Sequence, residues 1–246
     1  MKEFIWSDYI NDTVIISLKS RDDRKEKLDN RIGRIGLNDG KTLKDESRYF
    51  DAIDTQTMSK FPSGIHQREY DFDYHYLVDE IDRVKKYYGT GESVVTTEVE
   101  SAITFSHYAI WKNIVDNKIP VTLILEDDIA FSHDFLEKLG TVMTKELPKD
   151  WDLFYLSYLR TASIRAKNYS PLLHEVYNGL FWLSGYMLTY EGAKKLLDNL
   201  PVIGPVDVWI NYQFEKMKTY AMTDQIIWQA HDTQSSNSCS FGIKYW

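Results

Sequence analysis

Short apolar runs alternate along the chain with segments that have helical periodicity. The apolar runs are rich in β-branched and aromatic residues and are bounded by turn-forming residues, which is typical of buried strands. The predicted strands are residues 14–18, 49–53, 121–125, 153–156 and 181–188. The run 121–125 is almost continuously apolar, as expected of a central strand that is covered on both faces.

The clearest predicted helix covers residues 98–117. Thr97 and Glu100 have the spacing of a capping box at its start, and Pro120 follows its end. Its apolar positions recur with helical spacing and form one stripe: Val99, Ile103, Ile110, Trp111 and Ile114. Further helices are predicted over 21–30 with Ser20 as the N-cap, from Asp134 onward, and from Thr189 to Pro201.

This alternation of strands and helices predicts an α/β fold with a mostly parallel central sheet flanked by helices. The chain shows no internal repeat and no linker, so we predict one domain over residues 1–246. The pattern degrades over about 55–95, where turn residues mix with acidic and aromatic ones around one predicted helix at 77–88. A long connection of this kind is typical of a lid or of an insert, and both interpretations stay open.

Net charge, cysteine content and the lengths of the apolar runs restrict the classes of function and the compartments that fit this sequence. The chain has 246 residues and a formal net charge of −8, which argues against sequence-independent nucleic-acid binding. Its single cysteine, Cys239, excludes an intramolecular disulfide and favours a reducing compartment. It has neither an apolar run long enough to span a bilayer nor a signal-peptide pattern, so we predict a cytoplasmic protein. The sequence does not indicate an oligomeric state.

Three adjacent acids, Glu126, Asp127 and Asp128, directly follow the most apolar strand. Adjacent carboxylates repel one another unless a cation or donors compensate them, and ligands of α/β sheets gather at the carboxyl ends of strands. With strand geometry, Glu126 and Asp128 point to one side and Asp127 to the other. The pattern favours a Mn²⁺ or Mg²⁺ site, with a solvated acidic turn or a set of helix-capping acids as the alternative.

The chain resembles glycosyltransferase family 25, the group of lipopolysaccharide-type and procollagen-type galactosyltransferases. The similarity follows the chain in order over residues 14–24, 48–54, 100–111, 123–128, 151–156, 185–196 and 205–209. Residues 123–128 match the family's "LILEDD" closely, and 205–209 match its "PiDvWl". The chain departs from the family pattern at Ser17 and Thr55, and in the predicted helix at Val99, Ala102 and Ile103.

The resemblance implies a GT-A-like domain that transfers a hexose, with galactose as the first candidate, from a UDP-sugar to a hydroxyl of a glycan or glycosylated protein, with inversion. It implies metal ligation by Glu126 and Asp128, completed by His231, and Asp207 as the catalytic base. The positions predicted to bind the nucleotide sugar are Arg21, Arg24, Ser106, His107 and Asp127. Gly185 and Tyr186 are predicted to shape the acceptor side of the site, with Tyr186 as an exposed surface for stacking on a sugar.

Each of these residues also has a structural interpretation. Asp207 could cap the segment 208–214, and His107 lies on the apolar face of its predicted helix. Arg21 and Arg24 could belong to a solvated helix face, His231 to the surface, and Tyr186 to the core. A nucleotide- or glycan-binding module that has lost transfer is the alternative function. A metal-dependent phosphoesterase would fit the acidic triplet but not the other ordered motifs.

Overall fold

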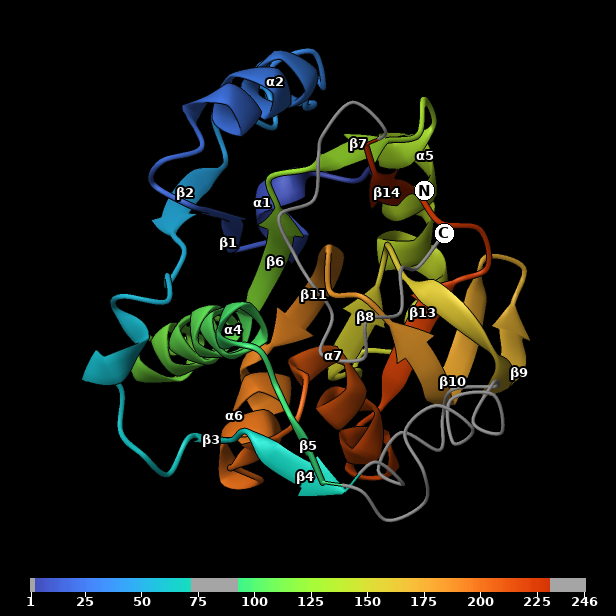
Figure 1. Ribbon diagram of the computed structural model, residues 1–246. Helices are drawn as coiled ribbons and strands as arrows, with labels where there is room; N and C mark the ends of the chain where they lie inside the picture. Colours follow the sequence, from blue (N-terminus) through green and yellow to red (C-terminus); the bar gives the residue numbers. More distant parts are fainter. Residues whose placement is uncertain (1–2, 72–92, 231–246) are drawn as a thin grey trace.

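An eight-stranded sheet forms the centre of the protein, in the order β2-β1-β6-β11-β8-β13-β10-β9 (Figure 1). The structure, a computed structural model, describes residues 3–71 and 93–230. The strands of this sheet are β1 (Asp12–Ser17), β2 (Arg48–Asp51), β6 (Val121–Glu126), β8 (Leu153–Tyr155), β9 (Leu159–Ser170), β10 (Leu173–Phe181), β11 (Gly185–Thr189) and β13 (Thr219–Met222). Strands β10 and β11 run opposite to the other six. The predicted α/β class with a mostly parallel sheet is confirmed.

Helices cover both faces of the sheet. The helical segments are α1 (Trp6–Tyr9), α2 (Asp22–Ile32), η1 (Met58–Lys60), α4 (Glu98–Asp116), α5 (Phe135–Thr141), η3 (Val142–Glu146), α6 (Tyr190–Asp198), α7 (Val206–Trp209) and η4 (Ile210–Lys216). One face packs on α1, α2 and α5, and the other on α4, α6 and η4. Consecutive residues of β6 serve the two cores alternately, because side chains of a strand point to opposite faces.

In the described residues, six short strands outside this sheet form three pairs between the segments that connect its strands and helices. They are β3 (His66–Gln67), β4 (Glu69–Asp71), β5 (Ser93–Val95), β7 (Ile129–Phe131), β12 (Val202–Ile203) and β14 (Ile227–Gln229). Strand β3 pairs with β12, β4 with β5, and β7 with β14. The described parts of the predicted lid or insert are therefore attached to neighbouring elements, whereas the helix predicted at 77–88 lies outside the described residues.

The predicted helix starts are partly correct. Thr97 and Glu100 form the capping box of α4, with the Glu100 amide 3.1 Å from Thr97 Oγ1 and the Thr97 amide 2.8 Å from Glu100 Oε2. Thr189 caps α6 by accepting a bond from the Gly192 amide. The cap predicted at Ser20 is wrong, because α2 begins one residue later and its N-cap, Arg21, makes no side-chain capping bond.

The strand predicted over 181–188 is also wrong in its first half. Phe181 ends β10 and Gly185 starts β11, with three residues between them. Trp182 has φ of +68°, in the left-handed region, which a strand cannot continue through. In the described residues, no helix has both the length and the apolar character needed to cross a bilayer.

Candidate active site

The acidic triplet lies where two adjacent parallel strands end. Glu126 is the last residue of β6, and it pairs with Ile16 of β1, one residue before that strand ends at Ser17. Asp127 and Asp128 form the tight turn that leads into β7. Because parallel strands bring their carboxyl ends to one edge of the sheet, Ser17 lies beside this turn, and its Oγ donates to Asp127 Oδ2 at 2.7 Å.

Arg24 holds the two aspartates of the turn. Its Nη1 lies 2.9 Å from Asp127 Oδ1 and 3.4 Å from Asp128 Oδ2, and all three side chains are at least 88% buried. One guanidinium therefore offsets the repulsion between two buried carboxylates. Arg24 and Asp127 thus have partners within the protein, and the nucleotide contacts expected of them stay predictions.

The shared arginine also corrects the predicted orientation of the acids. Strand geometry would place Asp127 opposite Asp128, but β6 ends at Glu126 and the turn brings both aspartates against Arg24. The turn, not the strand, determines their direction.

The negative charges of Glu126 and Asp128 are only partly compensated by neighbouring groups, so the charged form of each is disfavoured. Burial, followed by the neighbouring charges of Asp128, Asp127 and Asp207, raises the pKa of Glu126 to about 8. Burial also raises the pKa of Asp128, although Arg24 opposes this. Asp128 Oδ1 is buried and has no hydrogen-bond partner among the residues that the structure describes.

The acidic triplet can be compared with the sites that usually hold a divalent cation. Across residues 3–71 and 93–230, no group of three potential ligands converges on one point. Mg²⁺ and Mn²⁺ are nevertheless commonly held by one or two carboxylates together with phosphate oxygens of a substrate. Glu126 and the unpartnered Asp128 Oδ1 offer such a pair of oxygen ligands.

Asp207 lies close enough to the acidic triplet for its charge to act on Glu126. It lies in α7, whose N-cap is Pro205, so Asp207 is not the helix cap that the alternative interpretation required. Its Oδ2 accepts the amide of Trp182 at 3.4 Å. Burial raises its pKa, with a further contribution from Glu100, and its own charge contributes to the raised pKa of Glu126.

Trp182 connects Asp207 to the triplet, a role that was not predicted from the sequence. This half-buried residue has the left-handed φ noted above, which is an uncommon and strained conformation for a bulky side chain. Two residues later, the Ser184 carbonyl accepts the Glu126 amide at 3.0 Å. The segment 182–184 therefore bridges the two acidic positions, and a tryptophan in an apolar run has no sequence signal for such a conformation.

Four of the residues predicted to contribute to the site make contacts that support the fold. Two of them, Tyr186 and His107, belong to one buried hydrogen-bond network. Tyr186 is fully buried, and its hydroxyl contacts His107 Nδ1 at 2.9 Å and the Trp111 indole nitrogen at 3.0 Å. Burial lowers the pKa of His107 to about 3, which keeps the ring neutral. Such a buried network does not provide the exposed stacking surface expected of Tyr186, nor the nucleotide contact expected of His107.

Ser106 and Gly185 support the site indirectly. Ser106 Oγ accepts the Ile53 amide at 2.9 Å and so fixes the loop that follows β2. A Cβ at Gly185 would lie 3.1 Å from Ile227 Cδ1, so glycine permits close packing against β14.

Arg21 lies at the rim of the site. It forms a two-bond contact with Asp23, at 2.8 and 2.9 Å, which is the main cause of its raised pKa; Asp127 and Asp128 contribute further. His231 lies outside the described residues. The residue before it, Ala230, donates its amide to the Asp128 carbonyl at 2.7 Å.

Residues 10–210 match the family model described as glycosyltransferase family 25 (LPS biosynthesis protein). The chain belongs to glycosyltransferase family 25. This confirms the resemblance found in the sequence.

Two relatives illustrate the similarity. The chain is 30% identical to human procollagen galactosyltransferase 2 over 128 residues, which is 49% of this chain and 20% of that protein. It is 25% identical to the bovine probable inactive glycosyltransferase 25 family member 3 over 213 residues, which is 84% of this chain and 32% of that protein. The chain thus spans less than a third of the length of these relatives.

Among solved structures, the chain is similar to UDP-glucose pyrophosphorylase complexed with UDP-glucose, with a TM-score of 0.41 and 9% sequence identity. That alignment covers 87% of this chain and 90% of the other.

Proposed function

We propose that this protein is an inverting glycosyltransferase that moves a hexose from a UDP-sugar to a hydroxyl of a glycan or glycosylated protein. Galactose is the first candidate for the sugar, because the family's relatives include a procollagen galactosyltransferase. The observation that carries the proposal is that the Asp207 carboxylate is fixed by the Trp182 amide beside the acidic end of β6.

Asp207 is the proposed general base. A carboxylate with a raised pKa accepts a proton more readily than an ordinary aspartate, and burial raises the pKa of Asp207. The Trp182 amide holds one carboxylate oxygen, which orients the group and leaves the other oxygen to accept the proton of the attacking hydroxyl.

Glu126 and Asp128 would hold the divalent cation, with Mn²⁺ or Mg²⁺ as candidates. Such an ion, when bound, neutralises negative charge on a departing diphosphate. Arg24 restrains the turn so that Asp128 Oδ1 faces away from its guanidinium contact, and Arg21 at the rim supplies a further positive charge for the diphosphate. His231 stays a proposed third ligand.

A nucleotide- or glycan-binding module without transfer is the second candidate. It is favoured by Arg24, which already neutralises much of the charge of Asp127 and Asp128 without any cation. One relative in the family is itself named probable inactive.

The decisive experiment measures UDP release from a panel of UDP-sugars with added acceptor, with and without Mn²⁺. Asp207→Asn is the test variant, because asparagine still accepts the Trp182 amide. We expect nearly unchanged UDP binding and a fall in transfer of about 10²-fold or more, the low end for a lost general base.

Asp116→Asn serves as the matched control, because Asp116 is an exposed residue of α4 that pairs with Lys112. Transfer by Asp207→Asn at the rate of this control would remove Asp207 as the base. UDP binding without transfer for every donor tested would favour the binding module.

A further inference from the structure

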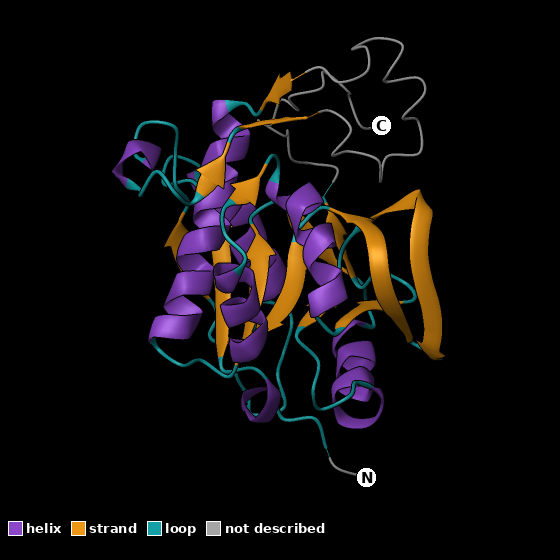
Figure 2. Cartoon of the chain, turned by 90° about the horizontal axis from the view of Figure 1, so that it is seen from below, coloured by secondary structure: helices purple, strands orange, loops and turns teal. Residues whose placement is uncertain are grey.

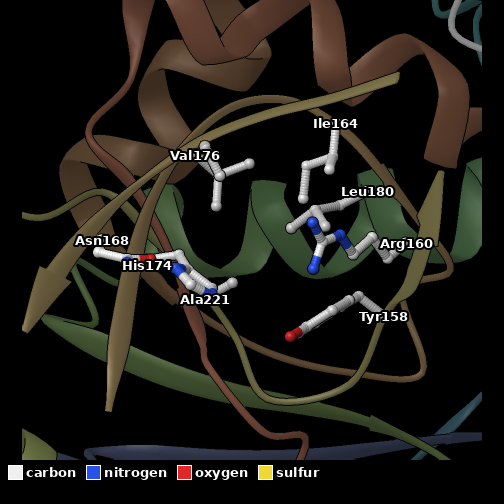
Figure 3. Close-up of a pocket in the computed structure, with 9 residues that line it drawn as sticks. Tyr158, Arg160, Ile164, Asn168, His174, Val176, Leu180 and Ala221 are labelled. Atoms are coloured by element: carbon white, nitrogen blue, oxygen red, sulfur yellow. The ribbon is translucent and has the colours of Figure 1, made fainter. Parts of the chain in front are cut away.

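A polar cavity lies under the hairpin of β9 and β10 (Figure 3). This hairpin stands at one side of the molecule (Figures 1 and 2). The cavity has a volume of about 100 Å³. Its polar lining comes from Tyr158, Arg160, Asn168 and His174, and its apolar lining includes Val176 and Leu180.

The charge of the cavity is positive, in a protein whose net charge is −8. Neither aspartate nor glutamate is among its lining residues, whereas Arg160 points its guanidinium into it. Burial raises the pKa of Tyr158, so the phenol adds no negative charge. The Tyr158 hydroxyl donates to the Met222 carbonyl at 2.7 Å, and this bond holds the ring in place at the side of the cavity.

Two lining groups lack partners in the part of the chain that the structure describes. Arg160 is exposed, and its side chain has no hydrogen bond or ion pair there. His174 Nδ1 is buried without a hydrogen-bond partner. In Figure 3 the His174 ring and Asn168 lie across the cavity from Arg160. A buried ring nitrogen without a partner is unfavourable unless a ligand or water supplies one.

We propose that this cavity binds an oxyanion, that is, a carboxylate or phosphate group. The guanidinium of Arg160 presents two parallel N–H donors that match the geometry of such a group, and His174 and Asn168 donate from the opposite wall. The volume of about 100 Å³ leaves room for one such group.

The cavity is adjacent to the candidate active site along one strand pair. Arg160 pairs with Leu180 and Leu159 with Phe181, and the next residue, Trp182, donates its amide to Asp207. The chemistry therefore suits a free anion and also an acidic group carried by an acceptor that reaches Asp207. The oxyanion site itself does not depend on the proposed transferase activity.

The first test is a titration of the full chain with inorganic phosphate and with acetate at constant ionic strength, followed through the NMR signals of the His174 ring. We expect a saturable shift for the unmodified protein. Arg160→Gln should weaken the affinity by about 10-fold or more, as expected when a charged hydrogen-bonding partner is lost. Arg160→Lys keeps the positive charge but loses the paired N–H donors of the guanidinium. Its affinity should therefore lie between those of the unmodified protein and of Arg160→Gln.

Arg165→Gln is the matched control, because Arg165 is exposed on the same strand and does not line the cavity. Circular dichroism confirms that each variant is folded. A shift that does not saturate, or an equal affinity in Arg160→Gln and Arg165→Gln, would overturn the proposal and assign the cavity to water.

The second test separates the two sources of the oxyanion by direct binding, without any transfer assay. It compares methyl glucuronide, which carries a carboxylate on a sugar, with neutral methyl glucoside. A glucuronide that binds more tightly than acetate and loses this preference in Arg160→Gln assigns the site to an acidic acceptor. If methyl glucuronide binds no more tightly than acetate, the site is assigned to a free anion.

Discussion

Arg24 is the residue on which the geometry of the acidic turn depends most directly. It contacts both Asp127 and Asp128 from α2, and all three side chains are buried. Arg24→Gln would leave two buried carboxylates without their positive partner. We expect the free energy of unfolding to fall by about 3–5 kcal/mol, the usual effect of removing one member of a buried ion pair. Urea denaturation measures this change.

The control for this variant is Arg21→Gln. Arg21 also follows β1 and pairs with an aspartate, but that pair with Asp23 is exposed, and exposed pairs contribute little to stability. Equal stability losses in the two variants would show that the contact between Arg24 and the turn does not stabilise the protein.

Glu126 gives the protein a specific dependence on pH when no metal is added. Its pKa in the folded state, about 8, lies above its ordinary value of 4.5, so the folded protein holds this proton more tightly than the unfolded chain. Its contribution to stability is therefore complete below the ordinary pKa and is lost as the pH rises through about 8.

We expect unfolding measurements in EDTA to show a lower free energy of unfolding at about pH 8.5 than at about pH 5. Glu126→Gln should remove much of this difference, because the amide does not titrate. Glu191→Gln, an exposed change in α6, should leave it in place. A pH profile unchanged in Glu126→Gln would mean that Glu126 is already ionised near neutral pH.

At the scale of residues, the sequence predicted a cluster of acids at the end of a strand but not the residue that compensates their charge. The triplet is visible because its members are adjacent and follow an apolar strand. Arg24 lies more than a hundred positions earlier, and its contact with the turn depends on the parallel pairing of β1 with β6. The role of Trp182 depends on a single backbone angle, which composition does not encode.

Helix α6 shows how tertiary contacts reverse a local preference. Replacing a helical glycine with alanine usually stabilises a helix by about 1 kcal/mol. At Gly192, however, the added Cβ would lie 2.4 Å from the Asp152 carbonyl oxygen, which also accepts the Thr189 amide. We expect Gly192→Ala to lower the free energy of unfolding by about 1–3 kcal/mol, because the helix must move away from this carbonyl.

Thermal and urea unfolding of Gly192→Ala test this prediction. Gly64→Ala is its control, since a Cβ at Gly64 meets no atom within 4 Å. A Gly192→Ala variant as stable as the unmodified protein would show that helix propensity outweighs the contact with Asp152.

At the scale of elements, prediction succeeded where a local signal exists. The capping box placed the start of α4 at the correct residue, and the apolar run placed β6. It failed for β9 and β10, the longest strands of the sheet. Most of β9 is exposed and polar, so it lacks the apolar alternation by which a strand is recognised.

At the scale of the whole molecule, the strand order was beyond prediction, because the sheet joins segments that are distant in the sequence. Strands β1, β2 and β6 are parallel neighbours and lie within residues 12–126. The antiparallel strand β11 then lies between β6 and β8, and β13 lies between β8 and β10. Local patterns predict the strands, but only packing of the two apolar cores determines their neighbours.

The position of β11 has a consequence for synthesis on the ribosome. When the nascent chain has emerged as far as β7, β6 can already pair with β1, but its other edge has no partner until β11 is translated. An open edge on an almost wholly apolar strand is a template for pairing with another chain. The interval between translation of residues 126 and 189 is therefore the period in which crowded, unfinished copies of this protein are most prone to aggregate.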